Sequence, residues 1–299
     1  MTALVCAFSR AYHAKNKTEK VFDDYLAGDI LTPGEYEQIA GHMSKGINYF
    51  YPSFEGTQEE ALRWVVDNQL SPSPLGRAAF AERALENAVR IGARQYLIFA
   101  AGYDTFAYRQ PGWAAKMHIF ELDHPATGAD KQRRIKAAGI EKPANLQYIS
   151  VDLTKSSWAG SLAACLEFAQ GKISFCSLLG ISYYLSEQDF AAAINAIAGL
   201  VPQGSTVIFD YPDEETYTEK AGERVKKQVA MAGAAKEKML ASYSYFTLEK
   251  LLADRDFLIY EHLTPSEITE QYFKKYNQAN PDQPITAFDN VSYCLAVKR

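Results

Sequence analysis

The sequence predicts an α/β protein built around a mostly parallel β-sheet with helices on both faces. From residue 95 onward, short apolar runs typical of buried strands alternate with segments of helical pattern. Such alternation favours a parallel sheet, because each crossover contains a helix that covers one of its faces. Residues 1–90 contain no convincing strand. We therefore expect an N-terminal helical cap over residues 1–91 and a core over residues 92–299, packed as one compact unit.

Seven apolar runs are expected to form the sheet. The first five alternate with helical patterns and are expected to be parallel. The last two are joined by a connection that contains Pro281 and Pro284, and we expect them to pair with each other, the final strand being antiparallel. The runs span residues 95–100, 117–122, 146–151, 173–179, 205–211, 257–263 and 291–297.

Helical patterns fill the N-terminal region and the connections between strands. The helix that begins at Pro74 is the clearest, because proline suits the first turn of a helix. The segment after the fifth strand, residues 213–241, predicts a long charged helix whose inner stripe is Val225, Val229 and Ala232. A solvated amphipathic helix is the default interpretation, and a lid over the site is the alternative. The other helices are expected over 3–14, 19–28, 35–44, 57–69, 74–91, 128–138, 157–169 and 187–199.

Composition and charge narrow the range of functions. A net charge of −5 argues against a general nucleic-acid-binding protein, which needs a basic excess to neutralise phosphates. No apolar run approaches the length of a membrane span, and no basic segment precedes the short apolar run at the N-terminus. The four cysteines form no CxxC pair, and the five histidines show no zinc-type spacing. We expect a cytoplasmic protein with reduced thiols, no membrane contact and no metal.

Small and acidic residues follow the first three strands in order. Ala100, Ala101 and Gly102 come after the first strand, where small side chains let the backbone approach a ligand. Asp123 comes after the second strand, about twenty residues beyond that turn, where a carboxylate can accept hydrogen bonds from two ribose hydroxyls. Its neighbour Glu121 is expected on the same side of the strand. A tight turn and a helix cap are the structural alternatives.

After the third strand, Asp152 and Leu153 suit a purine, since the acid accepts from an exocyclic amine while the aliphatic side chain packs on the ring. The turn after the first strand weakens the case for a dinucleotide, because the GxGxxG positions hold Ala100, Gly102 and Thr105. An NAD-dependent oxidoreductase is therefore disfavoured. A cofactor with ribose and adenine but no phosphate fits better, and S-adenosylmethionine meets that description.

These segments also carry a family resemblance. ARQYLIFAAGYDTFAYR, HIFELDHP and YISVDL resemble the pattern of the leucine carboxyl methyltransferase superfamily, in particular its branch of polyketide O-methyltransferases of the tetracenomycin type. The opening TALVCAFSRAYHAKNKTEKVFDDYLA, GRAAFAERAL, GISYYLS and SYFTLEKLLADRDF follow in the expected order. The resemblance implies a class I methyltransferase fold, with a seven-stranded sheet, an antiparallel last strand and preceding helices that cover the site.

The resemblance also assigns cofactor contacts. It implies that Arg77 binds the methionine carboxylate, which a guanidinium can hold through two parallel bonds. It assigns the methionine portion of the cofactor to Ala100, Ala101 and Gly102, the ribose to Asp123, and the adenine to Asp152 with Leu153.

Three positions depart from the family pattern. Ala100 replaces the first glycine of the turn, and Phe106 stands where many members have arginine, whereas Arg109 matches. Leu179 replaces a glutamate that the family usually carries immediately before the residue matching Gly180. A carboxylate is thereby lost near the sulfonium, and no compensating acid is evident from the sequence. A cofactor-binding protein that has lost catalysis therefore stays open as an alternative.

The methyl acceptor is expected between the N-terminal helices and the segment after the fifth strand. Tyr183, Tyr184 and Tyr211 are candidates to contact it, although packing explains each equally well. A carboxylate acceptor needs no general base, whereas a phenol is helped by one. His13 and His124 are the candidate bases, and both fit structural roles better, so we assign none. We predict an O-methyltransferase for a small-molecule carboxylate or phenol, with a protein C-terminal carboxyl methyltransferase ranked second.

Overall fold

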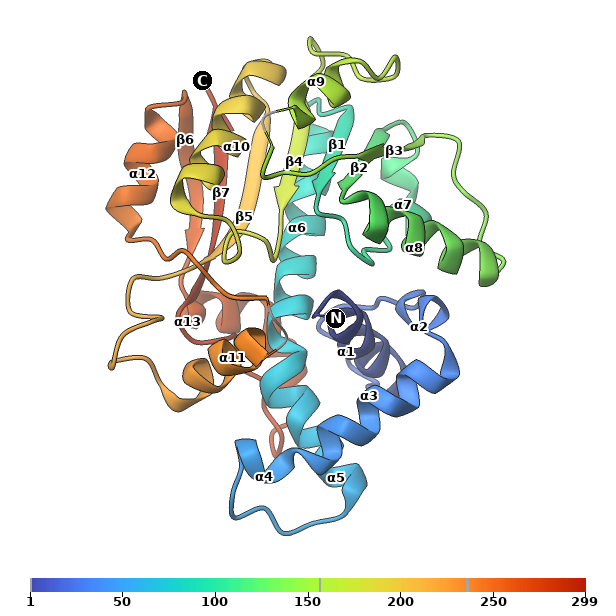
Figure 1. Cartoon of the computed structure of the whole chain (residues 1–299), viewed down its shortest axis with the longest axis vertical. Helices are drawn as coiled ribbons and strands as arrows, with labels where there is room; N and C mark the ends of the chain where they lie inside the picture. Colours follow the sequence, from blue (N-terminus) through green and yellow to red (C-terminus); the bar gives the residue numbers. More distant parts are fainter. Residues whose placement is uncertain (1, 156, 235–236) are drawn as a thin grey trace.

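A seven-stranded sheet forms the centre of the computed structural model, which describes residues 2–155, 157–234 and 237–299 (Figure 1). The strand order is β3-β2-β1-β4-β5-β7-β6, with β1 to β5 parallel and β7 antiparallel to both β5 and β6. All seven strands and their directions confirm the prediction. They span β1 (Gln95–Phe99), β2 (His118–Asp123), β3 (Leu146–Ser150), β4 (Ser174–Leu178), β5 (Thr206–Pro212), β6 (Phe257–Leu263) and β7 (Val291–Lys298).

Alternate residues of each strand sort into two apolar layers, because successive side chains of a strand point to opposite faces. Tyr96 and Ile98 of β1 pack with the layer of α6 (Pro72–Arg90) and α7 (Phe106–Arg109), which also contains residues of α13 (Pro265–Ile268), η3 (Thr269–Phe273) and α14 (Lys274–Ala279). Leu97 and Phe99 pack with the layer of α9 (Trp158–Ala163), α10 (Glu187–Leu200) and α12 (Tyr245–Ala253). Both faces of the sheet are therefore covered by helices, as predicted.

The N-terminal helices gather beyond one end of the strands, and α6 runs from them into the core (Figure 1). Their apolar cluster also contains Tyr103, from the loop after β1, and Ile135 of α8 (Pro125–Ala137). Arg134 of α8 forms an ion pair with Glu35 at 2.7 Å, which joins the same two parts. These helices are α1 (Thr2–Asn16), α2 (Ala27–Ile30), α3 (Pro33–Lys45), α4 (Ile47–Phe50), α5 (Gln58–Val65) and the π-helical η1 (Val66–Leu70).

The helix predicted over 19–28 is wrong, because only Ala27–Ile30 is helical there. Residues 17–26, called the strap below, are irregular and are held by side chains from elsewhere. The amide of Val21 donates to Nε2 of His13 at 2.9 Å, and Asp24 is buried among polar partners. These tertiary contacts satisfy groups that a helix would have satisfied locally.

Two further helices are shorter than predicted. The long helix expected over 213–241 is reduced to α11 (Glu223–Ala234), and residues 235 and 236 of that prediction lie outside the described residues. Oδ1 of Asp213 accepts from the amide of Glu215 at 3.0 Å, which favours a turn where the helix was expected to begin. The predicted inner stripe holds, since Val225 and Ala232 are buried. The helix predicted over 157–169 is also shorter, because α9 ends at Ala163. A short 3-10 turn, η2 (Gly112–Ala114), precedes β2.

Candidate active site

A cavity of about 310 Å³ lies at the carboxyl ends of β1, β2 and β4, where open α/β sheets bind their ligands. Residues from the cap, α6 and the loops that follow these strands line it. The structure brings most of the predicted cofactor residues together there. Its lining includes Arg77, Ala100, Ala101, Gly102, Asp123 and Leu179.

The turn after β1 owes its shape to two left-handed residues. Ala100 has φ 50° and Gly102 has φ 51°, a region that glycine adopts readily and alanine only with strain. The amide of Gly102 then points at Asp123 and donates to its Oδ2 at 2.5 Å. The turn therefore presents backbone, with no large side chain, to the cavity.

Asp123 is half-buried at the end of β2 and has two backbone donors. Besides Gly102, the amide of His124 donates to its Oδ1 at 2.6 Å. Burial raises the pKa of Asp123, against these hydrogen bonds, which act to lower it. Glu121 faces the same side but lies deeper, paired with Lys131 at 2.8 Å, and it does not line this cavity.

Arg77 of α6 lines the cavity and forms an ion pair with Asp210, a carboxylate that the sequence analysis did not single out. Its Nη1 lies 3.4 Å from Oδ2 of Asp210, a fully buried residue of β5. Burial acts to lower the pKa of Arg77, but Asp210 together with Cys6, Tyr183 and Tyr293 outweighs it and the pKa is raised, so the guanidinium stays charged. The signal was present in STVIFDY, where one acid interrupts an apolar strand.

Asp210 also lies beside the position where the family glutamate is missing. Leu178 pairs with Phe209 in the β4–β5 register, so Leu179 and Asp210 are the next residues along the same two strands. The amide of Gly180 donates to Oδ1 of Asp210 at 2.6 Å. A carboxylate is therefore present at this end of the sheet, although it comes from the neighbouring strand.

The strap is fastened over the cavity by buried ion pairs. Asp24 accepts from Nε of Arg10 at 2.8 Å and from the hydroxyl of Thr105 at 2.5 Å. Arg109 lies 3.3 Å from Asp24 and 2.5 Å from Glu82 of α6. Arg10 also donates to the carbonyl of Tyr103. The cap, the turn after β1 and α6 are thereby joined around the cavity, and of this network only Arg109 stood out in the sequence.

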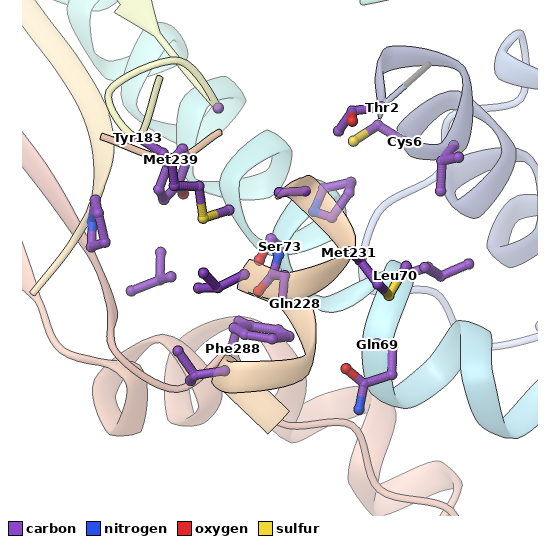
Figure 2. Close-up of a pocket in the computed structure, with 18 of the residues that line it drawn as sticks. Thr2, Cys6, Gln69, Leu70, Ser73, Tyr183, Gln228, Met231, Met239 and Phe288 are labelled. Atoms are coloured by element: carbon purple, nitrogen blue, oxygen red, sulfur yellow. The ribbon is translucent and has the colours of Figure 1, made fainter. Parts of the chain in front are cut away.

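A second cavity, of about 420 Å³, is drawn in Figure 2 and shares lining residues with the first. Its walls come from α1, η1, α6, α11 and the segment after β5, which is where the acceptor pocket was expected. Most of its lining is apolar, and it includes three of the five methionines of the chain, Met43, Met231 and Met239. Polar side chains also line it, and Figure 2 shows Ser73, Gln69 and Gln228 among them.

The two cavities share part of their lining, so a group bound in one lies next to a group bound in the other. The shared residues are Thr2, Cys6, Pro74, Arg77, Gly180 and Tyr184. This arrangement suits a transfer reaction between two ligands.

Comparison with known proteins agrees with this geometry. A family model described as "Leucine carboxyl methyltransferase" matches residues 3–198. A Bacillus subtilis protein named "Putative S-adenosyl-L-methionine-dependent methyltransferase YktD" is 37% identical over 304 residues, which cover 100% of this chain and 98% of that protein. The chain belongs to the leucine carboxyl methyltransferase family. It is an enzyme, a methyltransferase that uses S-adenosylmethionine.

Two more distant similarities are consistent with this assignment. A Mycobacterium marinum protein named "Putative S-adenosyl-L-methionine-dependent methyltransferase" is 28% identical over 223 residues, covering 74% of this chain and 69% of that protein. The crystal structure of a DUF574 family protein from Streptomyces avermitilis has a TM-score of 0.61 at 12% identity and covers 98% of this chain and 97% of its own. At that identity the likeness concerns the fold alone, which is the class I methyltransferase fold.

Two predicted cofactor residues of the methyltransferase lie outside both cavities. Asp152 accepts from the amide and hydroxyl of Thr154 at 3.0 and 2.6 Å, which makes a local turn after β3. Leu153 packs against the apolar layer of α9 and α10. Their assignment to adenine stays a prediction.

The three predicted tyrosines separate. Tyr183 and Tyr184 line the second cavity, and the Tyr183 hydroxyl donates to Asp210. Tyr211 lines neither cavity, which corrects the expectation. Its side chain belongs to the opposite layer of the sheet, and its hydroxyl is 2.6 Å from Nε2 of His262. The alternation of side chains along β5 explains this outcome, because Asp210 and Tyr211 point to opposite faces.

The histidines considered as bases have structural partners. His13 is buried beneath the strap, and His124 is the N-cap of α8, where its Nδ1 accepts from the amide of Ala126 at 3.3 Å. Neither histidine lines a cavity. In the described part of the chain, no cluster of three potential metal ligands occurs, and no helix is long and apolar enough to cross a membrane.

Proposed function

We propose that the first cavity holds S-adenosylmethionine with its methionine carboxylate at Arg77 and its ribose at Asp123. The cavity offers a charged guanidinium and a carboxylate on separate elements, α6 and β2, which suits a ligand with an acidic end and a diol. The small residues Ala100, Ala101 and Gly102 support close approach of the methionine portion. We keep Asp152 and Leu153 as candidates for adenine.

We further propose that the second cavity binds a small-molecule oxygen acceptor. The observation that carries this proposal is the apolar cavity that shares six lining residues with the first. Its volume of about 420 Å³ lies within the range of small-molecule sites. The bound cofactor supplies the methyl group, and the chain's own residues align the acceptor and exclude water.

The protonation of the lining residues bears on the type of acceptor. Burial raises the pKa of Tyr184, and burial with the nearby Asp210 raises that of Tyr183, so both hydroxyls stay protonated and can donate hydrogen bonds. The described residues that line the second cavity include no histidine, and their one carboxylate, Asp289, is exposed and lies 3.8 Å from Arg224. A carboxylate, ionised at neutral pH, needs no proton acceptor, so this lining favours it over a phenol.

An acceptor screen with isotopically labelled cofactor tests the proposal. We expect transfer to apolar carboxylic acids, seen as methyl esters that alkali hydrolyses, and less transfer to phenols, seen as alkali-stable ethers. Transfer to peptide C-termini alone would support the protein carboxyl methyltransferase. S-adenosylhomocysteine binding without any transfer would support a protein that has lost catalysis.

One pair of variants links turnover to the second cavity. Val229→Trp on α11 places a large ring in the cavity, and we expect at least about a tenfold loss of turnover, with S-adenosylhomocysteine affinity within about twofold of wild type. Ala230→Trp, on the exposed side of the same helix, is the control and should retain turnover. Equal turnover in both variants would contradict the assignment of this cavity.

Two broader proposals complete the functional assignment. We propose that the cap (residues 1–91) and the core (residues 92–299) form one compact unit. Three contacts link the two parts: Arg10 donates to the carbonyl of Tyr103, Asp24 accepts from the hydroxyl of Thr105, and Glu35 pairs with Arg134 of α8. We also propose a cytoplasmic location, which the four free cysteines, two of them buried, support.

A further inference from the structure

We propose that Asp210 is a positioning residue of this methyltransferase, whose buried carboxylate holds Arg77 for the cofactor and Tyr183 for the acceptor. The inference rests on the proposed cofactor site and deepens it. Asp210 lines neither cavity, so any effect it has on binding must pass through the side chains that it touches.

The Asp210 carboxylate of β5 contacts α6 and the loop after β4, which meet between the cavities. Oδ1 accepts from the amide of Gly180, in the loop after β4, at 2.6 Å. Oδ2 lies 3.4 Å from Nη1 of Arg77 on α6 and accepts from the hydroxyl of Tyr183. All three partners line at least one cavity, and Arg77 and Gly180 line both. Asp210 therefore contacts residues that line the cavities without lining either cavity itself.

A carboxylate with no solvent exposure is costly unless it is paired, so Asp210 constrains its partners as strongly as they constrain it. Tyr183 must turn its hydroxyl toward β5, and the Arg77 guanidinium must stay within reach of Oδ2. Of the remaining guanidinium nitrogens, Nη2 lies 3.7 Å from Sγ of Cys6, at the junction of the cavities. The orientation that leaves them for a ligand carboxylate is the one that Asp210 fixes.

The backbone of Gly180 packs against the Arg77 guanidinium and limits where it can lie. A Cβ on Gly180 would lie 2.3 Å from Nη1 and 2.7 Å from Cζ of Arg77. The guanidinium therefore lies directly on the glycine backbone, whose left-handed conformation (φ 70°) is held by the hydrogen bond to Asp210. Without the Asp210 carboxylate, both Arg77 and the Gly180 backbone beneath it would lose a polar partner.

A matched control exists on the same helix. Arg83 of α6 is paired with Glu261 of β6 at 2.6 Å, and neither residue lines a cavity. Glu261→Gln thus removes a carboxylate from an arginine of α6 without touching the site. We expect this variant to bind S-adenosylhomocysteine with wild-type affinity.

A double-mutant cycle on S-adenosylhomocysteine affinity, measured by calorimetry, tests the proposal. We expect Asp210→Asn to weaken binding about tenfold in the wild-type background, because one charge-assisted contact to Arg77 is lost. In an Arg77→Gln background the same substitution should change affinity less than about twofold, since its route of action is gone. Additive losses in the two backgrounds would overturn the proposal, because they would show that Asp210 acts independently of Arg77.

A second substitution covers the case in which Asp210→Asn does not fold. Asp210→Glu keeps the charge but moves it by one methylene, and we expect a loss of about threefold to tenfold that again vanishes in the Arg77→Gln background. Full wild-type affinity of Asp210→Glu would contradict a precise positioning role. If the wild-type protein itself bound no S-adenosylhomocysteine, the cofactor site would be refuted; if it bound and the cycle were additive, only the role of Asp210 would be.

Discussion

The amide of Gly102 donates to Oδ2 of Asp123 across 2.5 Å, and this contact ties the turn after β1 to the end of β2. The Asp123 carboxylate thus accepts a hydrogen bond from the turn, and we propose that it also binds the ribose hydroxyls. Gly102 and Asp123 both line the cofactor cavity.

Replacing Asp123 should therefore weaken cofactor binding. We expect Asp123→Ala to lower S-adenosylhomocysteine affinity by about tenfold to a hundredfold, because two hydrogen bonds to the ribose are lost. Asp123→Asn keeps an acceptor for the Gly102 amide and should lose less. Calorimetry gives both values, and unchanged affinity of the alanine variant would show that the ribose lies elsewhere.

The strained alanine of the turn offers a stability test. Ala100→Gly should raise the free energy of unfolding by up to about 1 kcal/mol, because glycine relieves the left-handed strain and only part of the gain is offset by chain entropy. Ala101, the next residue, has no positive φ, so Ala101→Gly should lower stability by about 0.5–1 kcal/mol. Denaturant unfolding measures both, and the same sign of change in the two variants would be inconsistent with strain at Ala100.

A side chain at Gly180 should displace the Arg77 guanidinium. Gly180→Ala would place a Cβ 2.3 Å from Nη1 of Arg77 and would force a left-handed backbone on alanine. We expect at least about a tenfold loss of S-adenosylhomocysteine affinity from the displaced guanidinium. Gly199 of α10 is the control, since its added Cβ would meet nothing within 4 Å. Wild-type affinity in Gly180→Ala would mean that the guanidinium position is unimportant.

Buried His13 should make stability depend on pH. Burial, reinforced by Lys17 and Lys20 and opposed by Asp23, lowers the pKa of His13 to about 3. Between its ordinary pKa near 6.5 and this value, the unfolded chain binds a proton that the folded protein does not. Stability contributed by His13 is therefore fully present above about pH 6.5 and falls by at most about 1.4 kcal/mol per pH unit below it.

His13→Gln isolates this contribution, because the glutamine oxygen can still accept from the amide of Val21 and does not titrate. We expect the wild type to lose about 1 kcal/mol more than the variant between about pH 7.5 and about pH 5.5, from urea unfolding at each pH. Parallel losses in the two proteins would assign the pH dependence to other groups.

Local patterns predicted the sheet well. Each of the seven apolar runs contains a strand. Gly102 and Asp123, chosen because they follow β1 and β2, line the first cavity. What local patterns lack is information about neighbours that are distant in sequence. The strap at 17–26 looked helical because the buried partners of Asp24, among them Thr105, lie far along the chain.

The same reason explains the missed acid. The loss of a glutamate at Leu179 is visible along one strand, whereas its neighbour Asp210 becomes apparent only from the register of β4 against β5. Tyr211 failed as a candidate for a simpler reason, since a strand sends adjacent side chains to opposite faces. Its neighbour Asp210 points to the other face, where it contacts Arg77 and Tyr183.

The structure of the complex with S-adenosylhomocysteine tests the central claim most directly. We predict that the ligand carboxylate lies on Arg77, the ribose hydroxyls on Asp123, and the sulfur at the junction that Cys6 and Tyr184 share between the two cavities. A sulfur atom turned away from the apolar cavity, or a ligand carboxylate without contact to Arg77, would contradict the account.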